Sequence, residues 1–186
     1  MKKFLSFPML MALGCTMFIT SCKKDDAARN NTGSGNLDAG KSAISLNASP
    51  AFAGGGSFSL SNTVTNTAQT LSSSSLRNIS LSATEISGTN TRTVMITIIT
   101  PVDASTTSGN LVADLSLPNG ATILPTVTLS STNGSSPGIT YGSTTGTLTV
   151  TKLTATEVEG TFSGEVKDVN GSATLSISNG SFAGKF

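Results

Sequence analysis

Apolar and polar residues alternate along much of this chain, and the alternation is clearest between Glu157 and Lys167. Val158, Phe162 and Val166 occupy one parity of this run, whereas charged and hydroxyl side chains occupy the other. A period of two is typical of a β-strand with one buried face and one solvated face. No stretch after residue 21 shows the 3.6-residue stripe of an amphipathic helix. We therefore expect strands to carry the fold.

Similar short alternating segments follow one another from about Lys41 to the C-terminus. Asn170-Gly171 is a strong hairpin signal, because a type I′ turn needs positive φ at both central residues. Ser and Thr make up roughly a third of the residues after position 36, far above average usage, and suit strands with one wet face. The run from Arg92 to Ile99 is apolar on both parities, which predicts a central strand buried on both sides.

Near the C-terminus the apolar parity changes, so that Phe182 and Phe186 follow Asn179-Gly180 out of phase with the preceding residues. We interpret this change as a β-bulge that keeps both phenylalanines in the core. The segment Asn62–Ser75 has little apolar content and is expected to be a long loop or a weak edge strand. The sequence thus predicts one all-β domain over residues 41–186, with about eight to ten antiparallel strands. The patterning leaves open a β-sandwich or an up-and-down β-barrel-like arrangement.

The N-terminus has the layout of a secretory signal peptide. A basic start is followed by the apolar stretch Phe4–Ile19, which is too short to span a bilayer comfortably. The sequence Ile-Thr-Ser-Cys ending at Cys22 resembles a bacterial lipobox, in which the cysteine is lipidated. This resemblance implies removal of residues 1–21 and an acylated Cys22 at the mature N-terminus. Cys15 is a rival site, but cleavage there would leave a second apolar segment on the mature chain.

The residues that follow Cys22 read Lys-Lys-Asp-Asp, and they resemble the export signal of Bacteroidetes outer-membrane lipoproteins. The resemblance implies an outer-membrane lipoprotein displayed on the cell surface, whereas a generic solvated tether is the alternative. Three acyl chains, including palmitate, would anchor the protein stably to the membrane. Residues 22–40 are rich in polar residues and glycine, and we expect them to form a lipidated flexible tether.

The C-terminal run also resembles a family of small, uncharacterised Bacteroidetes lipoproteins. The matching residues are the strand Gly146–Lys152, then Gly160–Ser163, then Asn179–Phe182. From the first match to the last they span residues 146–182, about a fifth of the chain. The resemblance implies a β-domain in the same compartment and carries no known activity or site.

The composition excludes several function classes. The chain contains no His, so Ser-His-Asp and Cys-His hydrolases and the usual zinc sites are excluded. We expect no metal site and no cofactor. Without residues 1–21 the chain has nine basic and ten acidic side chains, a balance that gives no electrostatic reason to bind nucleic acid.

Three residues are candidates for contact with a ligand. Glu157 and Glu159 lie two positions apart, about 6–7 Å along a strand, which is within the range of a glycosidase carboxylate pair. Tyr141 is the only tyrosine and lies near glycines, where it could contact a ligand. Asp168 and Asn170 match part of a calcium-binding loop pattern, but both residue types are also common in turns, and we expect a turn here. Asp103 and Asp114 flank a turn-rich segment, and we interpret them in the same way.

The function that these observations favour is a non-catalytic, membrane-anchored β-domain. It would bind an extracellular ligand or protein partner, or take part in a cell-surface assembly. Two alternatives stay open: a carboxylate-based glycan hydrolase, and a structural or adhesive protein that associates through strand edges.

Overall fold

The computed structural model describes residues 33–53, 55–61, 63–73, 75–104, 107–110, 123–134 and 136–186. Within these ranges the chain forms a ten-stranded sheet and one short 3-10 helix, which confirms the predicted all-β domain and its range of strand number. The elements are η1 (Ser34–Asn36), β1 (Lys41–Phe52), β2 (Gly55–Ser61), β3 (Thr67–Ser72), β4 (Leu76–Ser87), β5 (Asn90–Pro101), β6 (Thr107–Asn110), β7 (Leu124–Asn133), β8 (Ser136–Leu153), β9 (Glu157–Asp168) and β10 (Thr174–Lys185).

The strands follow an up-and-down path within one antiparallel sheet. From β3 to β10 each strand pairs with the next along the chain, except that β5 pairs with β7 and that β6 pairs with β8. The last strand, β10, returns to pair with β1, which carries β2 on its other side. The order β2-β1-β10-β9-β8-β7-β5-β4-β3 leaves β2 and β3 at the two ends of the path.

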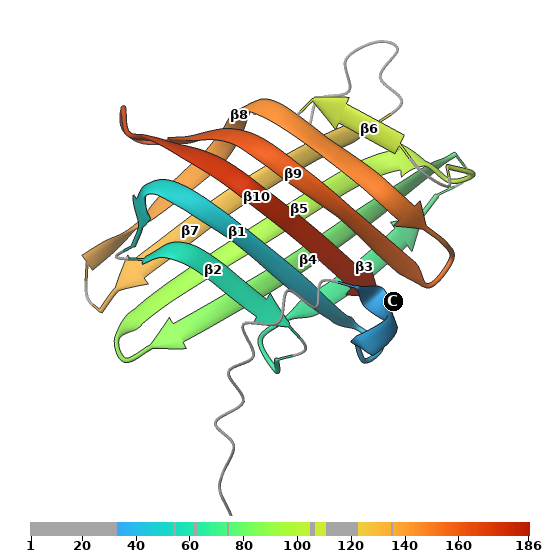
Figure 1. Ribbon diagram of the computed structural model, residues 1–186, viewed down its shortest axis with the longest axis horizontal. Coiled ribbons are helices and arrows are strands. Elements are labelled where there is room, and N and C mark those ends of the chain that lie inside the picture. The colour runs from blue at the N-terminus through green and yellow to red at the C-terminus, as the bar shows by residue number, and fades with distance from the viewer. Residues whose placement is uncertain are drawn as a thin grey trace, which may run out of the picture.

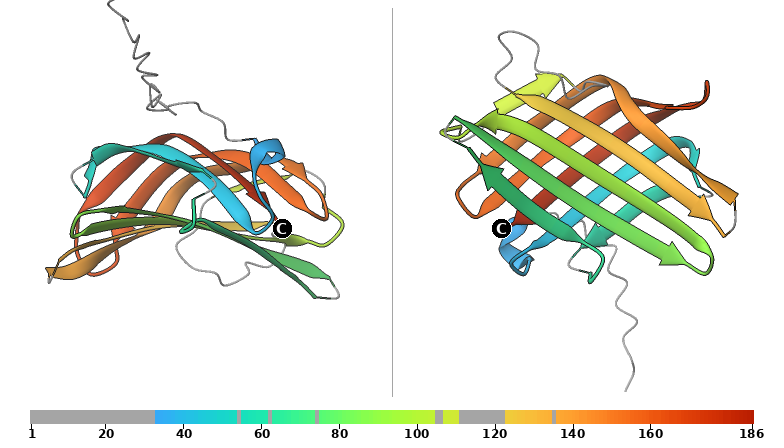
Figure 2. Two further views of the ribbon diagram at one scale, coloured as in Figure 1. Left: turned by 90° about the horizontal axis from the view of Figure 1, so that it is seen from below. Right: turned by 180° about the vertical axis from the view of Figure 1, so that it is seen from behind.

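The sheet curls over on itself and forms two facing layers (Figure 1, Figure 2). One layer contains β1, β2, β9 and β10, and the other contains β3, β4, β5 and β7, whose strands run across the first at a steep angle. The long strand β8 pairs with β7 through its first residues and with β9 through the rest, so it carries the sheet from one layer to the other. A strand that bends between layers is the usual corner of crossed sheets.

Two glycines allow the bend in β8 and β9. Gly146 and Gly164 face each other in the register, and a Cβ atom on Gly146 would lie 2.5 Å from the Cα atom of Gly164. Gly146 also has a φ of 128°, a backbone conformation that residues with a side chain rarely adopt. Glycine within a strand permits such a close approach of two backbones.

The inner faces of the two layers meet in one hydrophobic core. Val158, Phe162 and Val166 point into it, as the alternation predicts. The predicted bulge is confirmed, because the register between β10 and β9 shifts between Ile177 and Gly180. Beyond the shift, Phe182 is only 1% exposed, whereas Phe186 is half-buried and packs against the core.

The prediction that β5 is buried on both sides is wrong. The strand is interior to the sheet, with β4 and β7 beside it, and its inner side chains, such as Ile96, are fully buried. On the outer face, however, Met95 is 40% exposed and Ile99 is half-buried. The described elements form only two layers, so nothing in them covers this face, and Thr93 and Thr97 share it with the apolar residues.

Polar hydrogen bonds hold the first strand against the far layer. The backbone N–H of Ala68 donates to the carbonyl of Gly40 at 2.8 Å, and Ser42 Oγ donates to the carbonyl of Ser82 at 2.7 Å. The side-chain amide of Asn66 donates to the carbonyl of Ser42 at 3.0 Å. These bonds replace a regular ladder where β1 passes the start of β3.

Residues 33–40, which we expected within the tether, lie against the outer face of the first layer. Leu37 is 3% exposed and packs against Ala43 and Ala183 of β1 and β10. The described chain therefore reaches the sheet before the first strand begins at Lys41. Within the described ranges, no helix is long and apolar enough to cross a membrane.

Candidate functional site

The two predicted carboxylates on β9 contact other parts of the chain. The Nζ atom of Lys152 lies 2.6 Å from Oε2 of Glu157 and 3.5 Å from Oε1 of Glu159. Oε1 of Glu159 also accepts hydrogen bonds from Ser34, one from the backbone N–H at 2.8 Å and one from the hydroxyl. Glu159 therefore fixes the start of η1 on the sheet, which is a structural role.

The electrostatics of this cluster keep both carboxyls ionised. The hydrogen bond and charge of Lys152 hold the pKa of Glu157 below its ordinary value, and Glu157 in turn raises the pKa of Lys152. Burial opposes ionisation of Glu159, but the bonds from Ser34 and the charge of Lys152 outweigh it and lower its pKa. A glycosidase needs one carboxyl with a raised pKa as its general acid, so this arrangement does not favour that chemistry.

Tyr141 and the two glutamates lie at opposite ends of the β8–β9 strand pair. The register partner of Tyr141 on β9 is Asp168, at the opposite end of the strand from Glu157. The half-buried ring packs against the core and meets the ring of Phe52 edge-on, with centroids 6.2 Å apart. The structure therefore does not bring Tyr141, Glu157 and Glu159 together in one site.

The remaining sequence candidates divide between turns and undescribed segments. Oδ1 of Asp168 accepts a hydrogen bond from the backbone N–H of Asn170 at 2.9 Å, as expected for a turn. Cys22 and Asp114 lie outside the described residues. In the part of the chain that the structure describes, no three His, Cys, Asp or Glu side chains are grouped so that they could hold a metal ion.

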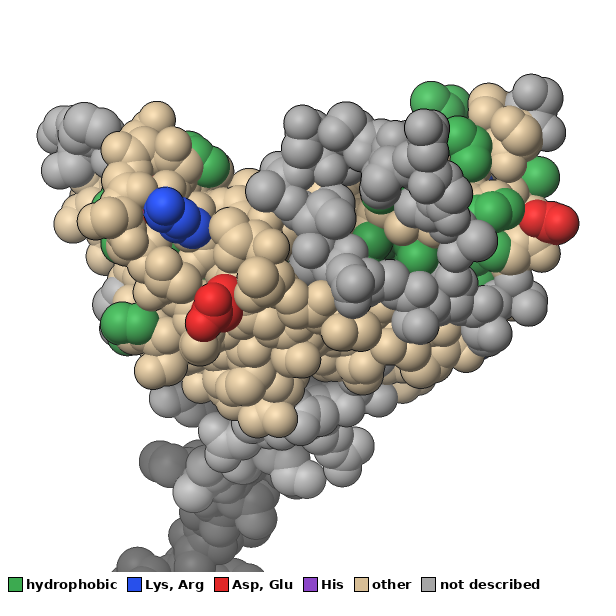
Figure 3. All heavy atoms as spheres, turned by 90° about the horizontal axis from the view of Figure 1, so that it is seen from above, with side chains coloured by type: hydrophobic (Ala, Val, Ile, Leu, Met, Phe, Trp, Pro, Cys, Tyr) green, Lys and Arg blue, Asp and Glu red, His purple; other side chains and the backbone are tan. Residues whose placement is uncertain are grey.

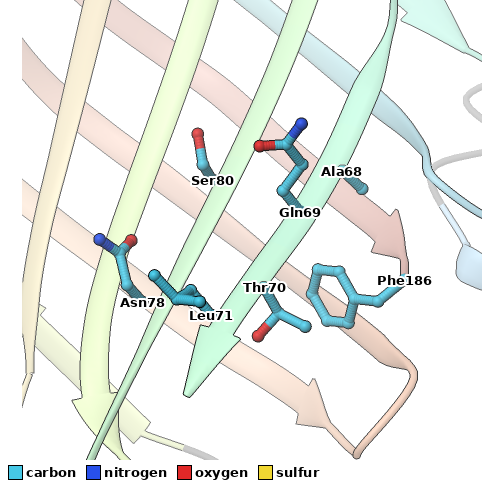
Figure 4. A pocket seen from close by; sticks show the side chains of 7 residues that line it. All are labelled: Ala68, Gln69, Thr70, Leu71, Asn78, Ser80 and Phe186. Atoms are coloured by element: carbon cyan, nitrogen blue, oxygen red, sulfur yellow. The ribbon is translucent and has the colours of Figure 1, made fainter. Parts of the chain in front are cut away.

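A groove of about 630 Å³ lies at the free edge of β3. Figure 4 shows the ring of Phe186, the residue after β10, pointing towards Thr70. No charged side chain lines this groove, which we call the edge groove. Its lining residues are Ala68, Gln69, Thr70, Leu71, Asn78, Ser80 and Phe186.

The inner side of the edge groove is fixed by a buried arginine of β4. Arg77 is 8% exposed, and its Nη1 and Nη2 atoms donate to the carbonyls of Thr154 and Ala155 at 2.7 and 3.1 Å. Its guanidinium lies 5.9 Å from the centroid of the Phe186 ring, within range of a cation–π contact. Arg77 thus joins β4 to the β8–β9 turn and holds the phenylalanine in place.

Unpartnered polar atoms gather on this inner surface. Among the described residues, the buried side-chain atoms without a hydrogen-bond partner are Thr70 Oγ1, Arg77 Nε and Thr100 Oγ1. Thr100 of β5 pairs with Arg77 of β4. Thr70 of β3 pairs with Ile79, which follows Arg77 by two residues on β4. Because buried polar atoms normally find partners, their concentration at one end of the sheet is unusual.

A second arginine joins the layers at the other end of the sheet. Arg92 of β5 contacts Glu85 and donates to the carbonyls of Phe52 and Gly55 in the β1–β2 turn. The hollow beside it, about 260 Å³, is smaller than the edge groove. The carboxylate of Glu85 balances the charge of Arg92, so we regard this end as structural.

Hydroxyl side chains dominate much of the surface. Seen from above, the molecule has few charged side chains, and hydrophobic side chains gather at one end of that view (Figure 3). A shallow hollow of about 460 Å³ lies on the outer face of β8, β9 and β10, and it has mostly hydroxyl lining. Its lining residues are Thr147, Thr149, Thr161, Phe162, Ser163, Asn179, Gly180 and Ser181.

Sequence reasoning missed the components of the edge groove. The alternation does not single out Arg77, and it predicts Phe186 only as a core residue. One signal was present: the chain has no charged residue between Lys41 and Arg77, a stretch that contains both ends of the strand path, β2 and β3. Natural edge strands commonly carry charges that prevent pairing, so their absence marks this edge.

Comparisons with models of protein families, with curated proteins and with solved structures found no match.

Proposed function

We propose that this protein is a lipid-anchored, non-catalytic binding protein of the bacterial outer membrane, displayed on the cell surface. The lipobox-like sequence at Cys22 supports the anchor, and the Lys-Lys-Asp-Asp sequence behind it supports the surface location. The described chain begins at Gly33, so about ten residues separate the proposed anchor from the domain, a reach of roughly 33–36 Å when extended.

The observation that carries the binding role is the uncharged edge groove. It combines the exposed side chain of Leu71 and the half-buried ring of Phe186 with polar groups from Gln69, Thr70 and Asn78. A concave, largely apolar surface with a few polar groups is the usual form of a binding site. Its position at a free strand edge adds main-chain donors and acceptors to that surface.

The state of the carboxylates supports a role without catalysis. Glu157 and Glu159 share Lys152, their pKa values are lowered, and neither lines the edge groove. Binding by the edge groove requires no titrating group. The domain therefore acts by holding a partner near the membrane.

Metabolic labelling with a palmitate analogue tests the anchor. We expect Cys22→Ala to abolish labelling and Cys15→Ala to leave it unchanged. Labelling that survives Cys22→Ala and disappears in Cys15→Ala would place the anchor at the other cysteine.

A thermal-shift screen of the full chain against glycans and peptides tests the binding role. A ligand at 100 times its Kd adds about 2.7 kcal/mol to the free energy of unfolding, which is a shift of several degrees. Leu71→Ser should abolish any shift that arises in the edge groove, because Leu71 is 76% exposed and lines it. Ile86→Ser is the matched control, since Ile86 is 64% exposed on β4 and does not line the groove. Shifts that are equal in both variants would place the site elsewhere.

A further inference from the structure

We propose that the edge groove binds an extended, uncharged peptide segment of another protein, which adds to the sheet as a strand beside β3. This inference rests on the proposed binding function and names the class of ligand. It requires free main-chain groups along β3, an edge without protection against pairing, and a surface for the side chains of the added strand.

The main-chain groups of β3 face the groove at alternate residues. The N–H of Ala68 donates to Gly40 and not to β4, so this residue presents its main chain to the free edge. Along a strand, the main-chain N–H and C=O groups of successive residues point to opposite sides. Thr70 and Ser72 therefore present these groups to the same edge as Ala68. Among the described residues, these groups have no main-chain partner on that side. An added strand can therefore form ladder hydrogen bonds with both residues.

The part of the edge beside Thr70 and Ser72 has no charge, proline or bulge that would prevent pairing. Free edges are normally protected by charged residues, proline, bulges or covering elements. β3 has no charged residue and no proline, and its register with β4 is unbroken from Thr67 to Ser72. Leu71 exposes 76% of its surface beside this edge. Such an edge is suited to the strand addition used in peptide recognition.

The lining indicates the chemistry of the peptide. Inward side chains of an added strand would lie beside Thr70 and against the Phe186 ring, which favours an apolar or hydroxyl residue. Outward side chains would lie beside Gln69 and Leu71. Arg77 is 8% exposed, its Nη atoms donate to two carbonyls, and it does not line the groove, so its guanidinium is not placed to pair with a charged side chain there. Burying a charge here without a partner would be costly, so the segment is uncharged.

The position of Gly40 excludes one register in which a second copy of this chain could pair with the edge. Symmetric antiparallel pairing of two β3 strands about Thr70 would place Ser72 of one copy opposite Ala68 of the other. The N–H of Ala68 is already bonded to Gly40, so that half of the edge is occupied. A single extended peptide needs only the half beside Thr70 and Ser72, where the groove opens.

The test is an NMR titration of the mature full-length chain in detergent micelles. The probe is the blocked, uncharged peptide acetyl-Thr-Val-Thr-Val-Thr-amide, and its control carries proline at the second and third positions, which removes a ladder donor whichever alternate residues face β3. We expect the probe to shift the amide signals of Thr70 and Ser72 and to slow their hydrogen exchange. The proline peptide should bind at least about tenfold more weakly, because it loses hydrogen bonds to the edge.

Two substitutions at one position separate main-chain from side-chain recognition. Thr70→Pro removes the edge-facing N–H without removing a β3–β4 ladder bond, and should weaken binding by about tenfold or more. Thr70→Val keeps that N–H and removes the unpartnered hydroxyl, so it should bind the probe as the wild type does. Ser72→Pro serves as the second variant if Thr70→Pro fails to fold.

Three outcomes would overturn the inference. A folded Thr70→Pro or Ser72→Pro variant that binds the probe like the wild type would show that β3 is not the edge used. If the probe does not bind, but a glycan gives a thermal shift that Leu71→Ser abolishes, the edge groove is a binding site whose ligand is not a peptide. Self-association that disappears in Thr70→Pro, without probe binding, would identify a second copy of the chain as the occupant.

Discussion

The Nη1 atom of Arg77 lies 2.7 Å from the carbonyl oxygen of Thr154, so a buried side chain of β4 is bonded to the turn between β8 and β9. This bond joins the two layers of the sheet at the end where the edge groove lies. The contact also sets the position of Phe186, whose ring lies beside the same guanidinium. The shape of the edge groove therefore depends on one arginine.

Replacement of Arg77 by methionine should destabilise the protein by about 3 kcal/mol, because two hydrogen bonds from a charged donor are lost and two carbonyls lose a partner. Urea denaturation of the variant measures this change. Lys167→Met is the control, since Lys167 is exposed on β9, and it should change stability by less than about 0.5 kcal/mol. Equal effects in the two variants would contradict the role of Arg77 in joining the layers.

Gly146→Ala should be strongly destabilising. The added Cβ atom would lie 2.2 Å from the carbonyl oxygen of Ser163, and the backbone has a φ of 128°. We expect a loss of at least about 2 kcal/mol, since both a clash and a disfavoured conformation are introduced. Gly35→Ala is the matched control, because a Cβ atom there has open space. Thermal unfolding of both variants checks the prediction, and a stable Gly146→Ala protein would mean that β8 does not bend in this way.

The two faces of β5 should respond differently to truncation. Ile96 is fully buried, so Ile96→Ala should cost about 2–5 kcal/mol. Met95, its neighbour, is 40% exposed on the outer face, and Met95→Ala should cost less than about 1 kcal/mol. Denaturant midpoints of the two variants measure the difference. A large loss for Met95→Ala would show that another layer covers this face in solution.

The contact of η1 with the sheet should weaken in acid. The pKa of Glu159 is lower in the folded chain than in the unfolded chain, so its contribution is present above its unfolded pKa and is lost as pH falls through the folded value. The stability difference between the wild type and Glu159→Gln should therefore shrink as the pH falls below about 4.3. Melting temperatures recorded between about pH 7 and pH 3 test this.

Glu165→Gln is the control for that experiment, because Glu165 is exposed on the same face of β9. We expect its stability to follow the wild type through the acid range more closely than Glu159→Gln does. If the two variants behave alike, the bonds between Glu159 and Ser34 contribute nothing to folding.

Much of the fold could be predicted from the sequence because alternation is a local property. Val158, Phe162 and Val166 identify the inner face of β9 without knowledge of any partner strand. The bulge at Asn179-Gly180 could be predicted because a strand that keeps its apolar residues on one face changes parity only where an extra residue is inserted. The choice between a sandwich and a single curled sheet depends on which strands pair across long distances, and alternation contains no such information.

The candidate site could not be predicted in the same way. Phe186 and Thr70 are far apart in the sequence, and only the return of β10 beside β1 brings them together. Glu157 and Glu159 look like a carboxylate pair, but their contacts with Lys152 and Ser34 depend on segments that alternation does not place. The outer face of β5 was misjudged for a similar reason, since apolar residues on both parities do not show whether a second layer exists.

Amide hydrogen exchange along β3 in the full chain, measured by NMR without any ligand, is the most direct test of the account. The N–H groups of Gln69 and Leu71 face β4, so we predict slow exchange for them and fast exchange for Thr70 and Ser72. That alternating pattern would establish a free edge beside the groove. Equal protection of all four amides would mean that the edge is already paired in solution, and would contradict a binding site there.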